Sequence, residues 1–203
     1  MNRLAIAAAL CLSSAGVVIA EQPAQSARAR ALAMVERLGG TATVDTAREG
    51  SPVIKVDLHK SAVTDADLAE LAALTALREL DLRLTSVTDE GIEHLGTLTH
   101  LRLLNLFRTQ LSDAGLRSLD PLRDLETLML GGTKVTDAGL ASLAKHPHLK
   151  KVSIFDTAVT DEAVPHLAKL EELTVLLNGK SKITAAGTEQ LQRALPAVRF
   201  DEM

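Results

Sequence analysis

Aliphatic residues recur along most of this chain in a pattern that repeats every 24 residues. In one copy, Leu77, Leu80 and Leu82 alternate with polar residues, which is the period-2 pattern of a half-buried strand. Further along each copy, apolar residues follow the spacing of one helical face, as Leu116 and Leu119 do. Each copy is therefore predicted to form a strand, a turn and a short helix.

Six copies account for residues 53–196 without an insertion. They begin at Val53, Leu77, Leu101, Leu125, Leu149 and Leu173. Counted from these residues, each copy has positions 1 to 24, and the strand is expected at positions 3 to 7. Since no copy can bury its apolar face alone, a fixed period of this length predicts a solenoid of stacked repeats.

The repeated sequence resembles the leucine-rich-repeat family. The second copy reads LRELDLRLTSVTDEGIEHLGTLTH and the fourth reads LETLMLGGTKVTDAGLASLAKHPH. Both are similar to the family pattern LxxLxLxxTxVTDxGLxxLxxL of the cysteine-containing subclass, with Thr or Ser replacing the usual Cys or Asn. The resemblance implies an α/β solenoid: a curved right-handed stack with a parallel sheet on its concave face and short helices on its convex face. Exported bacterial proteins often contain similar modules.

A hydroxyl side chain occupies position 9 in every copy. The six residues are Ser61, Thr85, Thr109, Thr133, Thr157 and Ser181. A hydroxyl both donates and accepts, so a ladder of them just after the strand can satisfy turn amides and carbonyls that the stack buries. We therefore interpret this position as structural and not as a set of nucleophiles.

An aspartate occupies position 13 in five copies. These residues are Asp65, Asp89, Asp113, Asp137 and Asp161. Each follows a Thr or Ser and opens a predicted helix, where a carboxylate can satisfy free N–H groups and meet the positive end of the helix. N-capping is the favoured interpretation, and a cation held by the stacked carboxylates is the alternative.

The segment before the repeats is predicted to shield the first repeat from water. Residues 21–52 would form this N-terminal cap, with a helix over residues 27–38 that stops at Gly39 and Gly40 and a short strand over residues 41–44. Such a cap is needed because the end of a solenoid otherwise exposes its core.

A second cap is expected at the other end. Residues 197–203 would form a final edge strand and a charged tail after Pro196 closes the last helix. The sixth copy departs from the repeat at Asn178, Ala185 and Thr188, as terminal repeats often do.

Residues 1–20 have the pattern of a signal peptide. Arg3 precedes an apolar run, and the small residues Val18 and Ala20 suit cleavage after Ala20, so we expect a secreted or periplasmic protein. An uncleaved anchor is the alternative, although about 17 apolar residues barely reach the length needed to span the hydrocarbon layer. Cys11 is the only cysteine, so the mature chain would contain no disulfide and no thiolate metal site.

Charge and composition narrow the function classes. The net charge of −4 becomes −5 when Arg3 is removed, because 21 basic and 26 acidic residues remain, and this disfavours nucleic acid as a partner. Aromatic residues make up 1% of the chain, so the core must be aliphatic.

The sequence contains no set of residues typical of catalysis or of cofactor binding. It has no G-x-S-x-G, no H-E-x-x-H and no glycine-rich phosphate loop. His94 and His166 would lie about 14 Å apart, and His100 and His148 about 10 Å apart, too far to share a metal ion. His146 and His148 flank Pro147 and are expected in a solvated turn. We therefore expect neither an enzyme nor a metal or cofactor.

The candidate binding site lies on the predicted concave face and its rim, at positions 3, 5, 7 and 8. The first two copies place a mixed-charge, solvated surface there, whereas the middle copies place Phe107 and Phe155 on either side of Gly131. Exposed phenylalanines without a packing role suggest an interface, with a slot of roughly 10 Å between the two rings. In the alternative, the rings fold over Gly131 and Met129 and only shield the sheet. The candidate residues are Leu103, Asn105, Phe107, Arg108, Met129, Gly131, Ser153, Phe155 and Asp156.

The sequence therefore predicts an exported, non-catalytic, monomeric binding module. Its partner is expected to be a protein or peptide, with a glycan as a further option, and the chain should not span a membrane once the signal peptide is removed. The alternative is a self-associating structural scaffold of the cell envelope.

Overall fold

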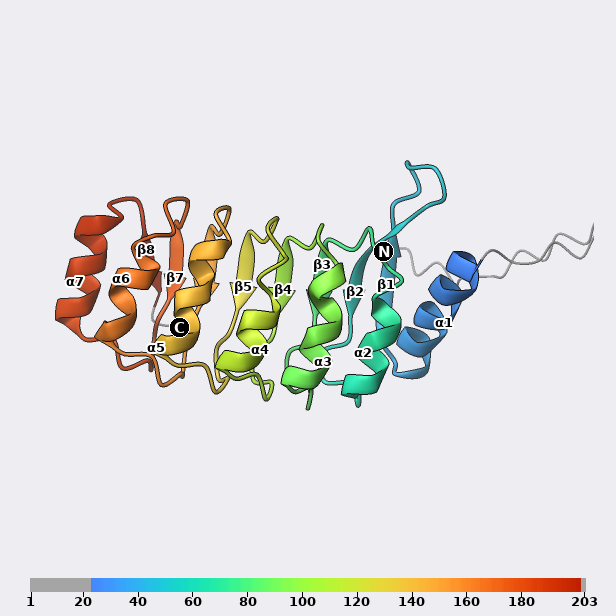
Figure 1. The fold of residues 1–203 in the computed structure, drawn as a ribbon, viewed down its shortest axis with the longest axis horizontal. Coiled ribbons are helices and arrows are strands. Elements are labelled where there is room, and N and C mark those ends of the chain that lie inside the picture. Colours follow the sequence, from blue (N-terminus) through green and yellow to red (C-terminus); the bar gives the residue numbers. More distant parts are fainter. Residues whose placement is uncertain (1–22, 202–203) are drawn as a thin grey trace, which may run out of the picture.

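The computed structural model describes residues 23–201, which form a single row of stacked repeats with helices on one side and one sheet on the other (Figure 1). The predicted signal peptide, with Cys11 and the cleavage site after Ala20, lies outside the described residues, as do residues 202–203. Export and cleavage therefore remain predictions.

Eight strands form the sheet in the order in which they occur along the chain. Their bounds are β1 Thr41–Val44, β2 Val53–Asp57, β3 Glu79–Asp81, β4 Leu103–Asn105, β5 Thr127–Met129, β6 Lys151–Ser153, β7 Val175–Leu177 and β8 Arg199–Asp201. β1 pairs with β2 in antiparallel fashion, and β2 to β8 are parallel. Each parallel pairing joins residues 24 apart, as Lys55 with Glu79 and Glu79 with Leu103. The sequence period thus sets the strand register, and the predicted parallel solenoid is confirmed.

The strands from β3 onward cover positions 3 to 5 and are shorter than predicted. The chain turns at position 8, where the backbone takes a positive φ in every copy. These residues are Lys60, Leu84, Arg108, Gly132, Asp156 and Lys180, with φ between 54° and 68°. Hydrogen bonds between copies nevertheless continue into the turn, since the Leu84 N–H donates to the Phe107 carbonyl and the Arg108 N–H to the Gly131 carbonyl, both at 2.8 Å. Positions 7 and 8 therefore form a rim beside the strands, in which backbone hydrogen bonds still join neighbouring copies.

A short helix in each repeat packs over the inner face of the sheet, and the other face of the sheet points outward (Figure 1). The α-helices are α1 Pro23–Arg37, α2 Asp65–Leu71, α3 Asp89–Glu93, α4 Asp113–Ser118, α5 Asp137–Leu140, α6 Val164–Leu167 and α7 Ala185–Ala194. Three 3₁₀ segments accompany them: η1 His94–Thr97, η2 Ala141–Lys145 and η3 Asp161–Ala163. Between this layer and the sheet lies one aliphatic core, in which Leu77, Leu80 and Leu82 are fully buried.

His146 belongs to this core, so the expected solvated turn at His146 is wrong. The residue occupies position 22, where the preceding copies carry Leu74, Leu98 and Leu122, all of which point inward. Its Nδ1 lies 2.9 Å from the Leu122 carbonyl oxygen, and its Nε2 is buried without a hydrogen-bond partner. Burial lowers the pKa of His146, which favours the neutral imidazole.

The hydroxyl ladder at position 9 is confirmed as structural in five of the six copies, including Ser181, and the exception is Ser61, whose Oγ is buried without a hydrogen-bond partner. The buried hydroxyls of Thr85, Thr109, Thr133 and Thr157 each donate to the carbonyl oxygen three residues earlier, over 2.6–2.8 Å. These bonds close the turn that leads out of each strand.

The aspartates at position 13 do not cap the helices they open, so that prediction is wrong. The N-cap is the residue before each one, such as Thr88 or Ser112, because that residue has the extended backbone of a cap. Each carboxylate instead reaches the next repeat: Asp65 accepts from the Thr88 N–H at 2.8 Å and from its hydroxyl at 2.7 Å. The same two bonds recur from Asp89, Asp113, Asp137 and Asp161. The aspartates thus join one repeat to the next.

Glycine at position 15 makes room for these carboxylates. A Cβ atom at Gly91, Gly115, Gly139 or Gly187 would overlap the aspartate oxygen of the preceding repeat. The fifth repeat has Ala163 there and begins with the 3₁₀ segment η3 in place of an α-helical turn. The Thr160 hydroxyl also lies 2.9 Å from Asp137, the longest of the five hydroxyl bonds.

Candidate functional site

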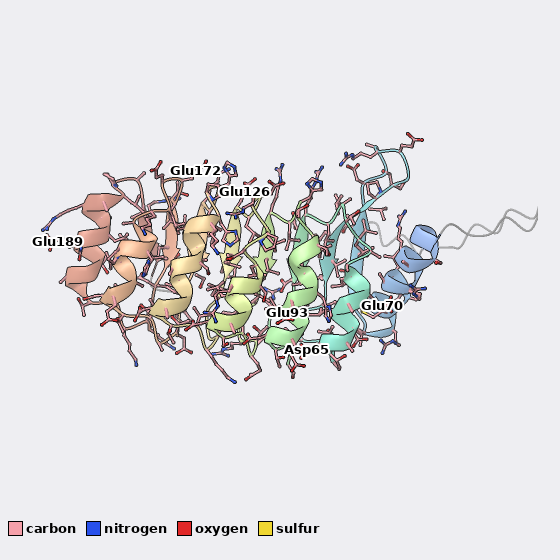
Figure 2. The ribbon with its side chains drawn as sticks, in the orientation of Figure 1. Asp65, Glu70, Glu93, Glu126, Glu172 and Glu189 are labelled. Atoms are coloured by element: carbon pink, nitrogen blue, oxygen red, sulfur yellow. The ribbon has the colours of Figure 1, made fainter. Side chains whose placement is uncertain are left out.

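The outward face of the sheet and its rim contain all nine candidate residues, but not all of them are accessible. Leu103, Asn105, Met129 and the two phenylalanines are half-buried, and Arg108 and Asp156 are exposed. Gly131 is buried, and Ser153 is only 2% exposed, so neither offers the accessible surface expected of it. The strands run toward the edge of the molecule at which the helices begin, and Figure 2 shows Asp65 on this edge. Glu126 and Glu172 lie on the opposite edge.

The charges of the first two repeats pair with one another. Lys55 lies 2.8 Å from Glu79, and Arg83 lies 3.3 Å from Asp81. The hydrogen bond to Glu79 raises the pKa of Lys55. Partial burial alone would raise the pKa of Asp57, but the hydrogen bonds from the His59 N–H and ring lower it overall. Apart from Lys60, the charged side chains on this half of the face are therefore paired with one another.

The two phenylalanines of the middle repeats lie close together over Gly131. Their ring centroids are 6.4 Å apart with an angle of 38° between the planes. A Cβ atom at Gly131 would lie 2.8 Å from Cδ2 of Phe107 and 3.0 Å from the Phe155 carbonyl oxygen. The predicted open slot is therefore wrong: since Gly131 has no side chain, the Phe107 ring leans into the space, and the rings cover the glycine as the alternative expected.

A cation flanks each ring. The Arg108 guanidinium carbon lies 5.3 Å from the Phe107 centroid, and the Lys180 ammonium lies 5.3 Å from the Phe155 centroid. The stem of Arg108 also leans over the next repeat, since a Cβ at Gly132 would lie 2.7 Å from Arg108 Cγ. Such contacts are worth about 0.5–1 kcal/mol at exposed sites and hold the cations against the rings.

Sequence reasoning missed two residues of this rim, Lys180 and Leu84. Leu84, 37% exposed, is the one exposed large apolar side chain among residues 26–201. Both residues occupy position 8, and reading that position along all six repeats would have found them. We call Leu84, Phe107, Arg108, Phe155 and Lys180 the aromatic rim.

Beside the aromatic rim, the sheet face carries a shallow groove of about 340 Å³. It is lined by outward side chains of the first five repeats, among them Glu79, Asp81, Asn105, Met129 and Lys151. Asn105 is held in place, since its amide donates to Asp81 at 3.4 Å and its carbonyl oxygen accepts from the Phe107 N–H at 3.1 Å.

The part of the chain that the structure describes contains no cluster of three His, Cys, Asp or Glu side chains arranged to hold a metal ion. Within the same residues, no helix combines the length and apolar character needed to cross a membrane.

Comparisons with known proteins agree with this architecture. A family model described as "Leucine Rich repeat" matches residues 73–96 and 97–119. An internalin from Listeria monocytogenes is 18% identical in sequence and superposes with a TM-score of 0.55, over 84% of this chain and 54% of the internalin. A leucine-rich-repeat protein from Leptospira interrogans is 20% identical with a TM-score of 0.47, over 66% of this chain and 39% of its own.

The chain thus spans about half the length of the internalin, and a smaller share of the Leptospira protein. No curated protein sequence matches it. The 24-residue register of the strands, the aliphatic core and the family model lead to one conclusion: this chain contains leucine-rich repeats and has the fold of a leucine-rich-repeat solenoid.

Proposed function

We propose that this chain is an exported, non-catalytic module whose aromatic rim and adjoining sheet face bind a partner protein or peptide. Leucine-rich-repeat domains are generally used for protein binding, and one observation supports the assignment to this surface. Two of the three phenylalanines in the chain, Phe107 and Phe155, lie half-exposed against each other outside an otherwise aliphatic core. Phenylalanine and arginine are both enriched in the buried centres of protein interfaces.

The chemistry of the aromatic rim and the groove supports a non-catalytic role. The rim offers apolar rings, an aliphatic side chain and two cations, which suit packing and charge recognition. A catalytic site needs a nucleophile, acid or base next to a group that activates it. The carboxylates of the first two repeats, the acidic groups nearest to the groove, are already paired with basic side chains.

The test begins with partner capture by the chain starting at Glu21 from a native extract, followed by titration of the identified partner. Phe107→Ala and Phe155→Ala should each weaken binding by about 2 kcal/mol or more, roughly 30-fold, if the rings are interface anchors. Lys60→Ala, in the turn of the first repeat, serves as the matched control and should leave the affinity unchanged. Equal affinity for all variants would contradict the proposal.

Export is a separate part of the proposal. We expect the exported protein to begin at Glu21, which N-terminal sequencing of secreted or periplasmic material would establish. Retention of Met1 in envelope material would favour the anchor instead.

The alternative function, a self-associating scaffold, can be distinguished by the mass of the protein in solution. As a binding module the chain should remain monomeric, so its mass in light scattering should be independent of concentration. A mass that rises with concentration would favour the scaffold.

A further inference from the structure

We propose that the aromatic rim recognises an acidic, extended segment of its partner protein. Two carboxylates of the segment would contact Arg108 and Lys180, and an apolar side chain between them would lie on Phe107 and Phe155. This inference rests on the proposed function and specifies the partner's chemistry.

Charge is unevenly distributed over positions 3, 5, 7 and 8 of the six repeats. In the first two repeats these positions contain three cations and three carboxylates, which are Lys55, Lys60 and Arg83, and Asp57, Glu79 and Asp81. In the remaining four repeats the same positions contain three cations and one carboxylate, which are Arg108, Lys151 and Lys180, and Asp156. The second group is therefore cationic in a chain whose net charge is −4.

The cations of the last four repeats also differ from Lys55 and Arg83 in their ion-pair partners. Within residues 23–201, Arg108, Lys151 and Lys180 take part in none of the ion pairs, whereas Lys55 and Arg83 each have a carboxylate within 3.3 Å. A partner carboxylate would therefore meet free cations at one half of the face, whereas among the described residues of the other half only Lys60, which follows His59 and not a phenylalanine, is free. Complementary charge of this kind determines which partner is accepted and in which register.

Two of these cations are already held in place. Arg108 and Lys180 each lie over a phenylalanine ring, 5.3 Å from its centroid, and the Arg108 stem leans over Gly132. Side chains that are already held lose less conformational freedom when a ligand binds.

The spacing of Arg108 and Lys180 suits an extended peptide. Arg108 and Lys180 occupy the same position three repeats apart, so their Cα atoms are separated by about 14 Å. An extended chain covers about 13 Å in four residues, and residues i, i+2 and i+4 point to the same side. A segment with carboxylates at i and i+4 and an apolar residue at i+2 would therefore match cation, ring pair and cation in turn.

The rim chemistry favours a protein segment over a neutral glycan. A sugar needs several neutral donors and acceptors around the aromatic face, but Gly131 and Met129 line the space beside the rings and Ser153 is buried. Apolar surface bounded by cations instead matches a peptide that carries carboxylates and one aliphatic side chain.

The experiment titrates the full chain from Glu21 with labelled peptides that contain Glu-Ser-Leu-Ser-Glu in a Gly-Ser background. Parallel titrations use the same peptide with Gln or Lys in place of both Glu, and a polyuronate chain. We expect the Glu peptide to bind at least about tenfold more tightly than the Gln peptide at low salt, and this difference to shrink as salt is added.

Two charge reversals provide the matched comparison. Lys180→Glu should weaken the Glu peptide about tenfold, whereas Lys60→Glu, in the same turn of the first repeat, should leave it unchanged. The double variant Arg108→Glu with Lys180→Glu should bind the Lys peptide better than the Glu peptide.

Three results would overturn the inference: equal binding of the Glu and Gln peptides, equal effects of Lys60→Glu and Lys180→Glu, or charge-dependent binding of the polyuronate alone. A captured partner that requires Phe107 and Phe155 but ignores both charge reversals would leave the proposed function standing and remove only the acidic segment. A partner that ignores the phenylalanines as well would remove both.

Discussion

The inward and outward positions of each repeat differ in how much they vary. Positions 9, 12 and 13 keep the same chemistry and form the same hydrogen bonds in most repeats, with Ala185 and the unbonded Ser61 hydroxyl as exceptions at the ends of the stack. Position 7 changes in nearly every repeat. Its residues are His59, Arg83, Phe107, Gly131, Phe155 and Gly179. Stacking requires each inward side chain to fit the side chains of the adjacent repeats, whereas the side chains of the rim project outward and have no such requirement. The chemistry of binding can therefore differ between repeats at the rim.

The largest effect is expected from opening the core. Leu128 is fully buried in β5, so Leu128→Ala should lower the free energy of unfolding by about 2–5 kcal/mol, because it leaves a cavity in a packed interior. Its outward neighbour Met129 is the matched control, and Met129→Ala should cost less than about 1 kcal/mol in the same chemical denaturation experiment. Equal losses would mean that the two faces of the sheet do not differ as described.

A smaller effect is expected where one repeat meets the next. A methyl group at Gly139 would overlap the Asp113 carboxylate, which accepts from the Thr136 N–H at 2.8 Å and its hydroxyl at 2.6 Å. Gly139→Ala should therefore lower the free energy of unfolding by about 2 kcal/mol. Gly96→Ala is the control, since its Cβ would meet only ordinary contacts from 3.5 Å, and it should be neutral or stabilising. A neutral Gly139→Ala would show that the aspartate bonds contribute little.

The threonine ladder should contribute less per residue. Thr133→Val removes the 2.6 Å hydrogen bond to the Leu130 carbonyl, which still accepts the Thr133 N–H at 3.2 Å. We expect a loss of about 0.5–1.5 kcal/mol in the free energy of unfolding. Thr127→Val, on the outward face of β5, should be neutral because the same change there breaks no inward hydrogen bond. A loss at Thr127 as large as that at Thr133 would contradict the distinction.

The smallest effect, of opposite sign, is expected at His146. His146→Leu restores the leucine that the neighbouring repeats have at this position and removes the unpartnered Nε2. Because the Leu122 carbonyl keeps its bond from the Leu125 N–H, stability at pH 7.5 should rise by about 1 kcal/mol. The pKa of His146 is lowered in the folded state, so the unfolded chain binds its proton first and stability falls as pH drops through about 6.5.

Denaturation at pH 7.5 and 5.5 checks both effects. His146→Leu should lose the part of the pH dependence that His146 contributes, whereas the exposed His148→Gln should retain it. An unchanged pH dependence in His146→Leu would contradict the assignment.

Much of the fold follows from periodicity alone. A period of 24 residues with leucine at positions 1, 4 and 6 is enough to predict a parallel stack, because identical units can bury their leucines only by pairing in register. The same period predicted the structural threonines and indicated which positions face outward. It also contained the signal for His146, which interrupts a column of leucines.

The errors arose where a side chain belongs to two repeats at once. The aspartates of position 13 have the sequence of helix caps, yet their carboxylates bond to the following repeat, because stacking brings the next Thr or Ser within reach. The slot expected at Gly131 was inferred from strand spacing, but only the three-dimensional packing determines that Phe107 leans across a missing side chain and that Lys180 meets Phe155. Periodicity fixes where a residue lies along the stack, whereas the direction in which its side chain leans depends on the size of its neighbours in the adjacent repeats.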